Sequence, residues 1–227
     1  MTFRKLLLIP ILAFGASVAN AQNLFNGKDL TGWEGNPELW RVEDGCIVGE
    51  TTADKKTAGN TFLIWKDGEL ADFELTVTAR VTGSNNSGIQ YRSRIVDPKK
   101  WVVGGYQMDM HPKANFFGML YEEKGRGIAA QRGQKVTLEA GAKPKVTGTV
   151  DASKELDLSE WNEFKIVARG NHVVHMVNGD VVAEITDNDE GKRALSGVLA
   201  LQLHAGAPMK IEAKDIVLKV LESDEKK

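Results

Sequence analysis

The stretch that decides the fold is Phe73-Glu74-Leu75-Thr76-Val77-Thr78-Ala79-Arg80-Val81, in which apolar and polar side chains alternate without a break. Successive side chains of a β-strand point to opposite faces of a sheet, so this pattern is typical of an antiparallel strand with one buried face. Asn178-Gly179 separates two apolar runs and predicts a hairpin, because both residues tolerate positive φ. No segment shows a sustained helical period. The sequence therefore predicts an all-β sandwich.

Further short segments have the composition of strands, with β-branched and aromatic residues bounded by turn formers. The predicted strands are 40–48, 61–65, 73–81, 88–95, 106–110, 118–121, 162–169, 173–177, 181–185, 197–204 and 211–221. Residues 123–159 contain few large apolar residues, and only 136–138 is expected to be a strand there. We therefore expect 22–227 to be one domain with a loop-rich insertion around 123–159, the kind of segment that often serves as a lid.

The first 21 residues have the composition of a cleaved export signal. Arg4 and Lys5 precede a short apolar run, and Ala19-Asn20-Ala21 supplies the small residues expected before a cleavage site. The run is too short for a spanning helix. An uncleaved N-terminal anchor is the alternative, but no stop-transfer charges follow. We expect residues 1–21 to be removed and the remaining chain to be exported, with no membrane span.

The composition argues against several classes of partner. The 29 Lys and Arg residues nearly balance the 31 Asp and Glu residues, and no basic block is present. Nucleic acid and anionic membrane are therefore poor candidates. Cys46 is the only cysteine, so no intrachain disulfide is possible. A core of this size does not need one. The sequence contains neither a Gly-rich phosphate loop after a strand nor a nucleophile elbow.

Three predicted strands pair an apolar face with a chemically capable one. In Gly105-Tyr106-Gln107-Met108-Asp109-Met110-His111, the alternation places an amide, a carboxylate and an imidazole on the same face. The other two strands repeat the pattern, with Gln90, Arg92 and Arg94 on 88–95 and Ala200, Gln202 and His204 on 197–204. If these strands share a curved sheet, their polar faces form one groove.

Groups of these types bind sugar hydroxyls and serve acid–base chemistry. A sheet face that merely meets water is the alternative, but surface strands usually carry Thr, Lys and Glu rather than His. A divalent metal on Asp109, His111 and His204 is compatible with the pattern, although no motif demands it. The candidate substrate-binding residues are Gln90, Gln107, Gln202, Asn86, Tyr121, Glu123 and Arg126.

Four blocks of the chain resemble one known family in the same order. They are Leu24-Phe25-Asn26-Gly27-Lys28-Asp29-Leu30-Thr31-Gly32-Trp33, Asn86-Ser87-Gly88-Ile89 with Arg92, Gly105-Tyr106-Gln107-Met108-Asp109, and Leu201-Gln202-Leu203-His204-Ala205-Gly206 after Gly197. The likeness covers nearly all of 22–227, and the chain is identified as a member of the 3-keto-disaccharide hydrolase family. The resemblance implies a concanavalin/laminin-G-like jelly-roll sandwich of two antiparallel sheets. It also implies a bacterial periplasmic or secreted protein that acts on an oligosaccharide or glycoside.

The namesake activity of that family is cleavage of glycosides oxidised to a ketone at sugar C3. The ketone acidifies the hydrogen on C2, a base removes it, and the enolate expels the C1 substituent by β-elimination, with or without later addition of water. We expect Asp109 or His111 to be the base. Arg92 or a bound metal would stabilise the enolate, and His204 would assist the leaving group. Many relatives have Glu and Gln where this chain has Gln107 and Asp109, so the carboxylate is displaced here by two residues on the same face.

A hypothesis from a different class is a non-catalytic, lectin-like carbohydrate-binding module of the cell envelope, because jelly rolls serve both purposes. The chemistry of the pocket discriminates between the two. A catalytic pocket would bring Asp109, His111 and His204 close enough to perturb one another. A lectin groove would be lined by aromatic and amide groups with ordinary protonation.

Overall fold

The alternating stretch that starts at Phe73 forms β6 (Phe73–Gly83) in the computed structural model, which describes residues 21–222. Leu75, Val77 and Ala79 are fully buried, whereas the polar residues between them are half-exposed. On the half-exposed face, Arg80 donates two hydrogen bonds to Glu212 of the neighbouring strand, at 2.8 and 3.0 Å. The predicted period-two strand is confirmed.

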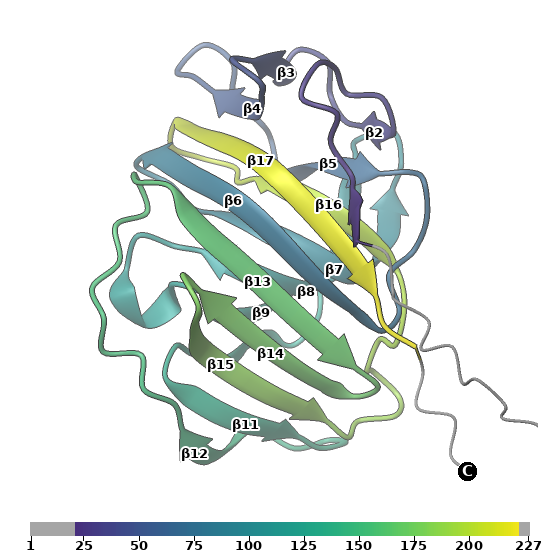
Figure 1. The fold of residues 1–227 in the computed structure, drawn as a ribbon, viewed down its shortest axis with the longest axis vertical. Coiled ribbons are helices and arrows are strands. Elements are labelled where there is room, and N and C mark those ends of the chain that lie inside the picture. Colours follow the sequence, from purple (N-terminus) through teal and green to yellow (C-terminus); the bar gives the residue numbers. More distant parts are fainter. Residues whose placement is uncertain (1–20, 223–227) are drawn as a thin grey trace, which may run out of the picture.

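β6 lies within a ten-stranded sheet of the described chain, here called the large sheet (Figure 1). The strand order is β12-β11-β15-β14-β13-β6-β17-β4-β3, and β1 also pairs with β17. All pairs are antiparallel except β11 with β15. The other bounds are β1 (Ala21–Asn23), β3 (Trp40–Glu43), β4 (Cys46–Thr51), β11 (Gln134–Leu138), β12 (Lys145–Thr149), β13 (Asn162–Arg169), β14 (His172–Val177), β15 (Asp180–Asp187) and β17 (Met209–Val220).

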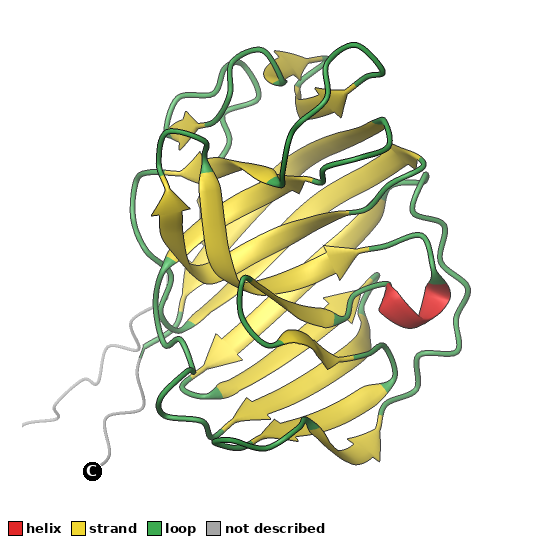
Figure 2. Ribbon diagram, turned by 180° about the vertical axis from the view of Figure 1, so that it is seen from behind, coloured by secondary structure: helices red, strands yellow, loops and turns green. Residues whose placement is uncertain are grey.

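A seven-stranded antiparallel sheet, the small sheet, packs against the large one, as the view from behind shows (Figure 2). Its order is β10-β9-β8-β7-β16-β5-β2, with bounds β2 (Trp33–Glu34), β5 (Thr61–Trp65), β7 (Ser87–Asp97), β8 (Val102–Met110), β9 (Leu120–Glu123), β10 (Gly127–Ala130) and β16 (Val198–Leu203). One 3-10 helix, η1 (Ala114–Phe116), is the only helical element in the described part of the chain. No helix among the described residues is long and apolar enough to cross a membrane.

The apolar faces of the two sheets bury one core, so the predicted sandwich is confirmed. A polar link crosses this core. The Tyr91 hydroxyl lies 2.7 Å from His175 Nε2, and His175 Nδ1 lies 2.9 Å from the carbonyl oxygen of Gly118. Burial lowers the pKa of His175 to about 4, so the ring is neutral, donates from Nδ1 and accepts the Tyr91 proton at Nε2.

The β7–β8 hairpin bends over the outer face of the small sheet, the face turned away from the core. Its register shifts between Tyr91 and Arg94, and again between Ile95 and Asp97. At the hairpin tip, the Trp101 carbonyl accepts a 2.9 Å hydrogen bond from the backbone N–H of Phe62 on β5, which is not a neighbour of β8 in the sheet. The tip therefore covers a second, smaller apolar cluster made of Phe62, Ile64, Val103 and Ala200.

Within 123–159, β11 contains the strand predicted at 136–138, and β10 and β12 are two further strands that the sequence interpretation missed. β12 is an edge strand with exposed side chains, so it needs few apolar residues. β11 buries only Val136 and Leu138. Segment 40–48 also differs from the prediction: it is the β3–β4 hairpin, turning at Asp44-Gly45 with φ of 51° and 73°. The predicted export signal lies outside the described residues except for Ala21.

Candidate active site

A pocket of about 240 Å³ lies on the outer face of the small sheet, where β8 and β16 end and β5 and β7 begin. Most of the residues singled out from the sequence line it. These are Asn86, Gln107, Asp109, His111, Tyr121, Glu123, Gln202 and His204. The lining is completed by Asn60, Phe116, Met119 and Ile128. The alternation on β8 and β16 thus brings the predicted carboxylate, imidazoles and amides together.

Asp109 is the buried carboxylate of this pocket, with 2% of its surface exposed. Its backbone is fixed on both sides, because its N–H donates to the Met119 carbonyl at 3.0 Å and its carbonyl accepts from the Gly118 N–H at 2.8 Å. Burial raises the pKa of Asp109 to about 7, and the nearby Glu123 charge acts in the same direction. Hydrogen bonds from Gln107 and Asn86 oppose this rise. The carboxyl group therefore titrates near neutral pH.

A row of buried amides orients the Asp109 carboxylate. Ser93 Oγ donates to Gln90 Oε1 at 2.6 Å, and Gln90 Nε2 donates to Gln107 Oε1 at 2.8 Å. Gln107 Nε2 then donates to Asp109 Oδ1 at 2.7 Å, and Asn86 Nδ2 donates to the same oxygen at 3.2 Å. Oδ2 receives no hydrogen bond from the described residues. One carboxylate oxygen is thus held while the other is available for chemistry.

Gly88 makes room for this row. A Cβ added there would lie 2.4 to 2.7 Å from Cδ, Cγ and Nε2 of Gln107. We expect Gly88→Ala to push Gln107 off Asp109 and to lower kcat/KM for a reaction in which this carboxylate acts by about 10- to 100-fold, since catalysis depends on exact placement. Gly191→Ala is the matched control, because its Cβ would meet only Asp189 Oδ1 at 3.5 Å. Equal kcat/KM for Gly88→Ala and the wild type would show that Gln107 does not position Asp109.

The two pocket histidines present opposite tautomers. His111 Nδ1 accepts a 2.9 Å hydrogen bond from the Lys113 backbone N–H, so in the neutral ring Nε2 carries the proton. His204 Nδ1 lies 2.7 Å from the Ala205 carbonyl, to which it can only donate, so its Nε2 holds the lone pair. Burial lowers the pKa of His111, and Lys113 and His204 lower it further. His111 is thus a neutral donor near His204.

Tyr121, Glu123 and Asn60 form the remaining polar wall. Burial and the Glu123 and Asp109 carboxylates raise the pKa of Tyr121, so the phenol stays protonated. Asn60 Nδ2 donates to Glu123 Oε2 at 3.1 Å, and Asn60 Oδ1 accepts from the Ala205 N–H at 3.0 Å. The sequence interpretation missed Asn60. Its only local signal is its place immediately before the predicted strand 61–65.

Arg92 is not in the pocket, which corrects the hypothesis that it stabilises an enolate. The register shift after Tyr91 and a φ of 46° break the alternation, and the Arg92 side chain is 1% exposed. Its Nη2 donates to Asp72 Oδ1 at 2.9 Å. Nε and Nη1 donate to the carbonyls of Ala71 and Gly170, at 2.7 and 2.6 Å. Arg92 therefore ties the small sheet to loops of the large sheet.

Two other predicted binding residues also lie outside the pocket lining. Gln90 is fully buried and acts through Gln107. Arg126 forms ion pairs with Glu122 and Asp187, and Asp187 also accepts a hydrogen bond from Tyr106. These carboxylates raise the pKa of Arg126, although its partial burial opposes the rise. The predicted direct contact of Arg126 with substrate is therefore not supported by its position.

The proposed metal ligands do not form a metal centre. Among the described residues, no group of three or more His, Cys, Asp or Glu side chains is arranged to hold a metal ion. The donor set of Asp109, His111 and His204 therefore does not fit the divalent metal considered from the sequence.

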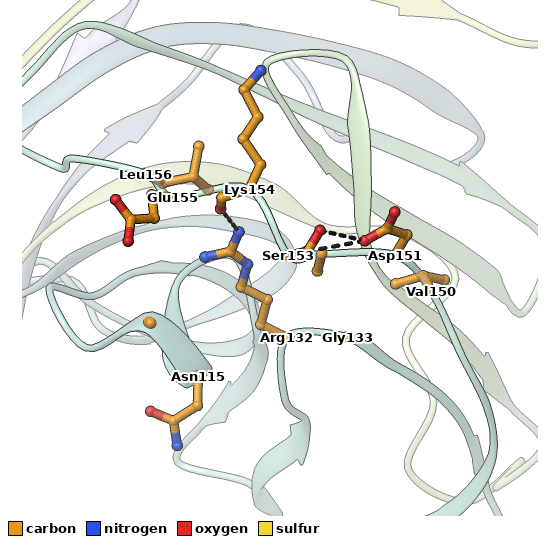
Figure 3. A pocket seen from close by; sticks show the side chains of 11 residues that line it. Asn115, Arg132, Gly133, Val150, Asp151, Ser153, Lys154, Glu155 and Leu156 are labelled. Atoms are coloured by element: carbon orange, nitrogen blue, oxygen red, sulfur yellow. Dashed lines mark hydrogen bonds between the residues drawn. The ribbon is translucent and has the colours of Figure 1, made fainter.

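A larger cavity of about 720 Å³ lies between η1, the turn at Arg132-Gly133 and segment 150–156 (Figure 3). Arg132 Nη2 donates to the Lys154 carbonyl across it, at 2.5 Å. None of the residues predicted for the site lines this cavity, and the side chains of 150–156 are exposed or half-buried. The buried, titratable groups are in the smaller pocket.

Comparisons with known structures agree with this fold. The chain superimposes on a candidate glycosyl hydrolase of Parabacteroides distasonis with a TM-score of 0.61 and 23% identity, covering 90% of this chain and 95% of that one. It superimposes on the carbohydrate-binding module CBM66 of Bacillus subtilis with a TM-score of 0.55 and 14% identity, covering 85% and 98%. The fold is thus the concanavalin-like jelly roll of two antiparallel-rich sheets, found among carbohydrate-active proteins.

The family follows from the sequence match. Residues 20–219 match the model of the 3-keto-alpha-glucoside-1,2-lyase-like domain, and the chain belongs to that family. It is 27% identical over 184 residues to a 3-keto-disaccharide hydrolase of Bacteroides thetaiotaomicron. That alignment covers 71% of this chain and 57% of the relative, so the chain spans a little over half of the relative's length. The resemblance inferred from the four sequence blocks is confirmed.

Proposed function

We propose that the protein cleaves glycosides bearing a ketone at sugar C3, with Asp109 removing the C2 proton. The observation that carries the proposal is the buried carboxylate with one oxygen held and a pKa raised to about 7. A general base is most effective when its pKa lies near the working pH. Asp109 is thus ionised often enough to accept a proton and basic enough to retain it.

His111 supplies the group that the enolate requires. When the C2–H bond breaks, the proton goes to Asp109 and negative charge develops on the C3 oxygen. The neutral imidazole of His111 carries its proton on Nε2, and its lowered pKa keeps it in that form. A fixed N–H donor in a water-poor pocket stabilises such an oxyanion. His111 takes the role that the sequence interpretation had given to Arg92.

His204 serves the second half of the reaction. The enolate electrons form the C1–C2 double bond, the C3 ketone returns, and the C1–O bond breaks. In its protonated form His204 keeps Nδ1–H on the Ala205 carbonyl and offers Nε2–H to the departing oxygen. Addition of water across C1–C2 by the reverse steps gives net hydrolysis. Gln202 and Tyr121 of the lining supply hydrogen bonds to the remaining hydroxyls.

The electrostatics of the pocket favour an enzyme over the lectin-like alternative. A binding module gains nothing from a desolvated carboxylate, which costs stability when ionised. Here Glu123 contributes to the raised pKa of Asp109, and His204 contributes to the lowered pKa of His111. Carboxyl and imidazole pKa values shifted by burial and by neighbouring charges are typical of catalytic sites.

The test is turnover of 4-nitrophenyl 3-keto-α-glucoside beside the unoxidised glucoside. We expect nitrophenol release from the keto substrate alone, because only the ketone acidifies C2. Release from both at equal rates would indicate an ordinary glycosidase. Release from neither by the folded protein would refute the proposal and favour the binding module.

We expect kcat/KM to rise with pH through an apparent pKa of about 7, because Asp109 must be ionised to act as base. Below that pH, activity should fall about tenfold per unit. Glu123→Gln removes a negative charge that raises the pKa of Asp109. It should therefore move the rising part of the pH–rate profile to lower pH. If kcat/KM rises at the same pH in Glu123→Gln as in the wild type, or rises near pH 4, the titrating group is not Asp109.

A further inference from the structure

The catalytic pocket has room for only part of a glycoside. Its volume of about 240 Å³ lies below the roughly 300–1,000 Å³ of sites that enclose a drug-sized ligand. Phe116, Met119 and Ile128 line it as apolar groups. If the ketone-bearing ring occupies this pocket, the group attached to C1 must lie outside it.

A second pocket of about 430 Å³ adjoins the first, and Asn60 lines both. It is formed by segment 54–61 before and into β5, the β7–β8 hairpin tip, and residues of the β2–β3 connection. The hairpin tip is anchored there, because Thr61 Oγ1 donates to the Lys100 carbonyl at 3.0 Å. Asn60 is itself fixed by Glu123 and Ala205. The two pockets therefore share a rigid wall.

The second pocket is predominantly basic. Lys55, Lys56, Lys99 and Lys100 line it, against the two acidic residues Glu38 and Asp54. Among residues 21–222, these lysines form one ion pair, between Lys100 and Asp97, with Nζ and Oδ2 4.0 Å apart. The lining of this pocket thus carries four lysines from two loops against two carboxylates, an excess of positive charge.

The second pocket also offers an aromatic surface and unused polar groups. Trp101 packs on the outer apolar cluster and is half-exposed in the pocket lining. Its Nε1 and the Thr57 hydroxyl are buried without a hydrogen-bond partner among the described residues. Buried polar groups normally have partners, so these two groups call for water or a ligand as a partner. An indole face beside ammonium groups suits a ring that carries an anionic substituent.

We infer that this basic pocket is the subsite for the leaving group and selects glycosides whose C1 substituent carries an acidic group such as a carboxylate. As a leaving-group subsite it rests on the proposed function. The lysines would attract the anion, Trp101 would stack on the ring, and Asn60 would mark the boundary at which the C1–O bond is broken.

The test compares 3-keto-α-glucosides of 4-hydroxybenzoate and of its methyl ester at low salt. Their aglycones have the same ring but differ in charge. We expect the wild type to prefer the acid by about five- to tenfold in kcat/KM, the scale of a few partly screened ion pairs. Lys99→Gln/Lys100→Gln should remove most of that preference by lowering kcat/KM for the acid. Added salt should reduce the preference in the same way. A second pair, ending in a glucuronate and its methyl ester, distinguishes a sugar acid from an aromatic one.

Lys143→Gln/Lys145→Gln is the control, because both lysines are exposed near β12 at the far edge of the large sheet. If the acid and the ester of both pairs are cleaved with equal kcat/KM, the inference is overturned and the proposed function stays intact. Calorimetric binding of the unoxidised 4-carboxyphenyl glucoside needs no turnover. A third outcome is that the wild type binds the acid preferentially, that Lys99→Gln/Lys100→Gln loses this preference, and that no keto substrate is cleaved. That result would support the anion-binding role of the pocket and refute the proposed function.

Discussion

Asp109→Asn is expected to abolish turnover of 3-keto-glycosides while raising the free energy of unfolding by about 2–4 kcal/mol at pH 8. The substitution keeps an oxygen that can accept from Gln107 and Asn86, so the amide row persists. It removes the charge that is desolvated in the folded state. Loss of function with gain of stability is the behaviour expected of a strained catalytic group.

The pH dependence of this gain has a definite sign. The usual pKa of 3.8 rises to about 7 in the fold, so the folded state binds the proton more tightly. Between these values, raising the pH ionises the unfolded chain first and lowers the stability of the wild type. The advantage of Asp109→Asn should therefore be absent at pH 3.5, grow from pH 4 to 7, and level off above pH 8.

Urea denaturation of both proteins across this range measures the effect. Asp180→Asn, at a carboxylate that is 51% exposed, is the control and should show no such growth. A variant that is less stable than the wild type at pH 8, or one that retains full turnover, would contradict the assignment of Asp109 as the buried base.

Arg92→Met is expected to lower the free energy of unfolding by about 3–5 kcal/mol, the cost of removing one partner from a buried ion pair. Asp72 would lose its charged partner, and the carbonyls of Ala71 and Gly170 would lose their donors. The kcat of the folded fraction should be unchanged, because Arg92 does not line the pocket.

Denaturation midpoints and active-site-normalised turnover separate these two effects. Arg94→Met, two residues along the same strand and exposed, should change stability by no more than about 0.5 kcal/mol. A folded Arg92→Met protein of near-native stability but greatly reduced kcat would restore the role that the sequence had suggested for Arg92.

The alternation of apolar and polar residues predicted the regular strands and the side chains that share a face on them. β6 and β13 lie where period two places them, and β13 and β5 have the predicted ends, although all five residues of β5 are buried. On β8, Gln107 and Asp109 share one face as expected, and His111 follows at its end. Regular strands carry this information because each side chain direction is fixed by its neighbour.

The failures arise where tertiary structure overrides alternation. A β-bulge after Tyr91 turned Arg92 away from the face that Gln90 occupies, and bulges leave no simple trace in an alternating sequence. β12 escaped detection because an edge strand can be polar throughout. Asn60 reaches the site only because β5 and β16 pair across a long separation in the sequence, a contact that no local pattern encodes.

The burial of the polar face was equally invisible in the sequence. Gln90, Gln107, Asp109 and Gln202 are at most 2% exposed, although a polar sheet face normally meets water. The bent β7–β8 hairpin and the segments around the pocket cover these side chains. It is this burial, rather than the residue types alone, that raises the pKa of Asp109 to about 7.

The central claim is tested most directly by exchange of the C2 hydrogen in D₂O, followed by proton NMR on 3-keto-1,5-anhydroglucitol, whose C1 carries no exocyclic group to expel. The substrate isolates the first step from bond cleavage. We predict that the wild type exchanges the C2 hydrogen with a rate that rises through pH 7, and that Asp109→Asn does not exchange it. Equal exchange by the wild type and Asp109→Asn, or cleavage of 3-keto-glycosides by a wild type that catalyses no exchange above the buffer rate, would contradict proton removal by Asp109.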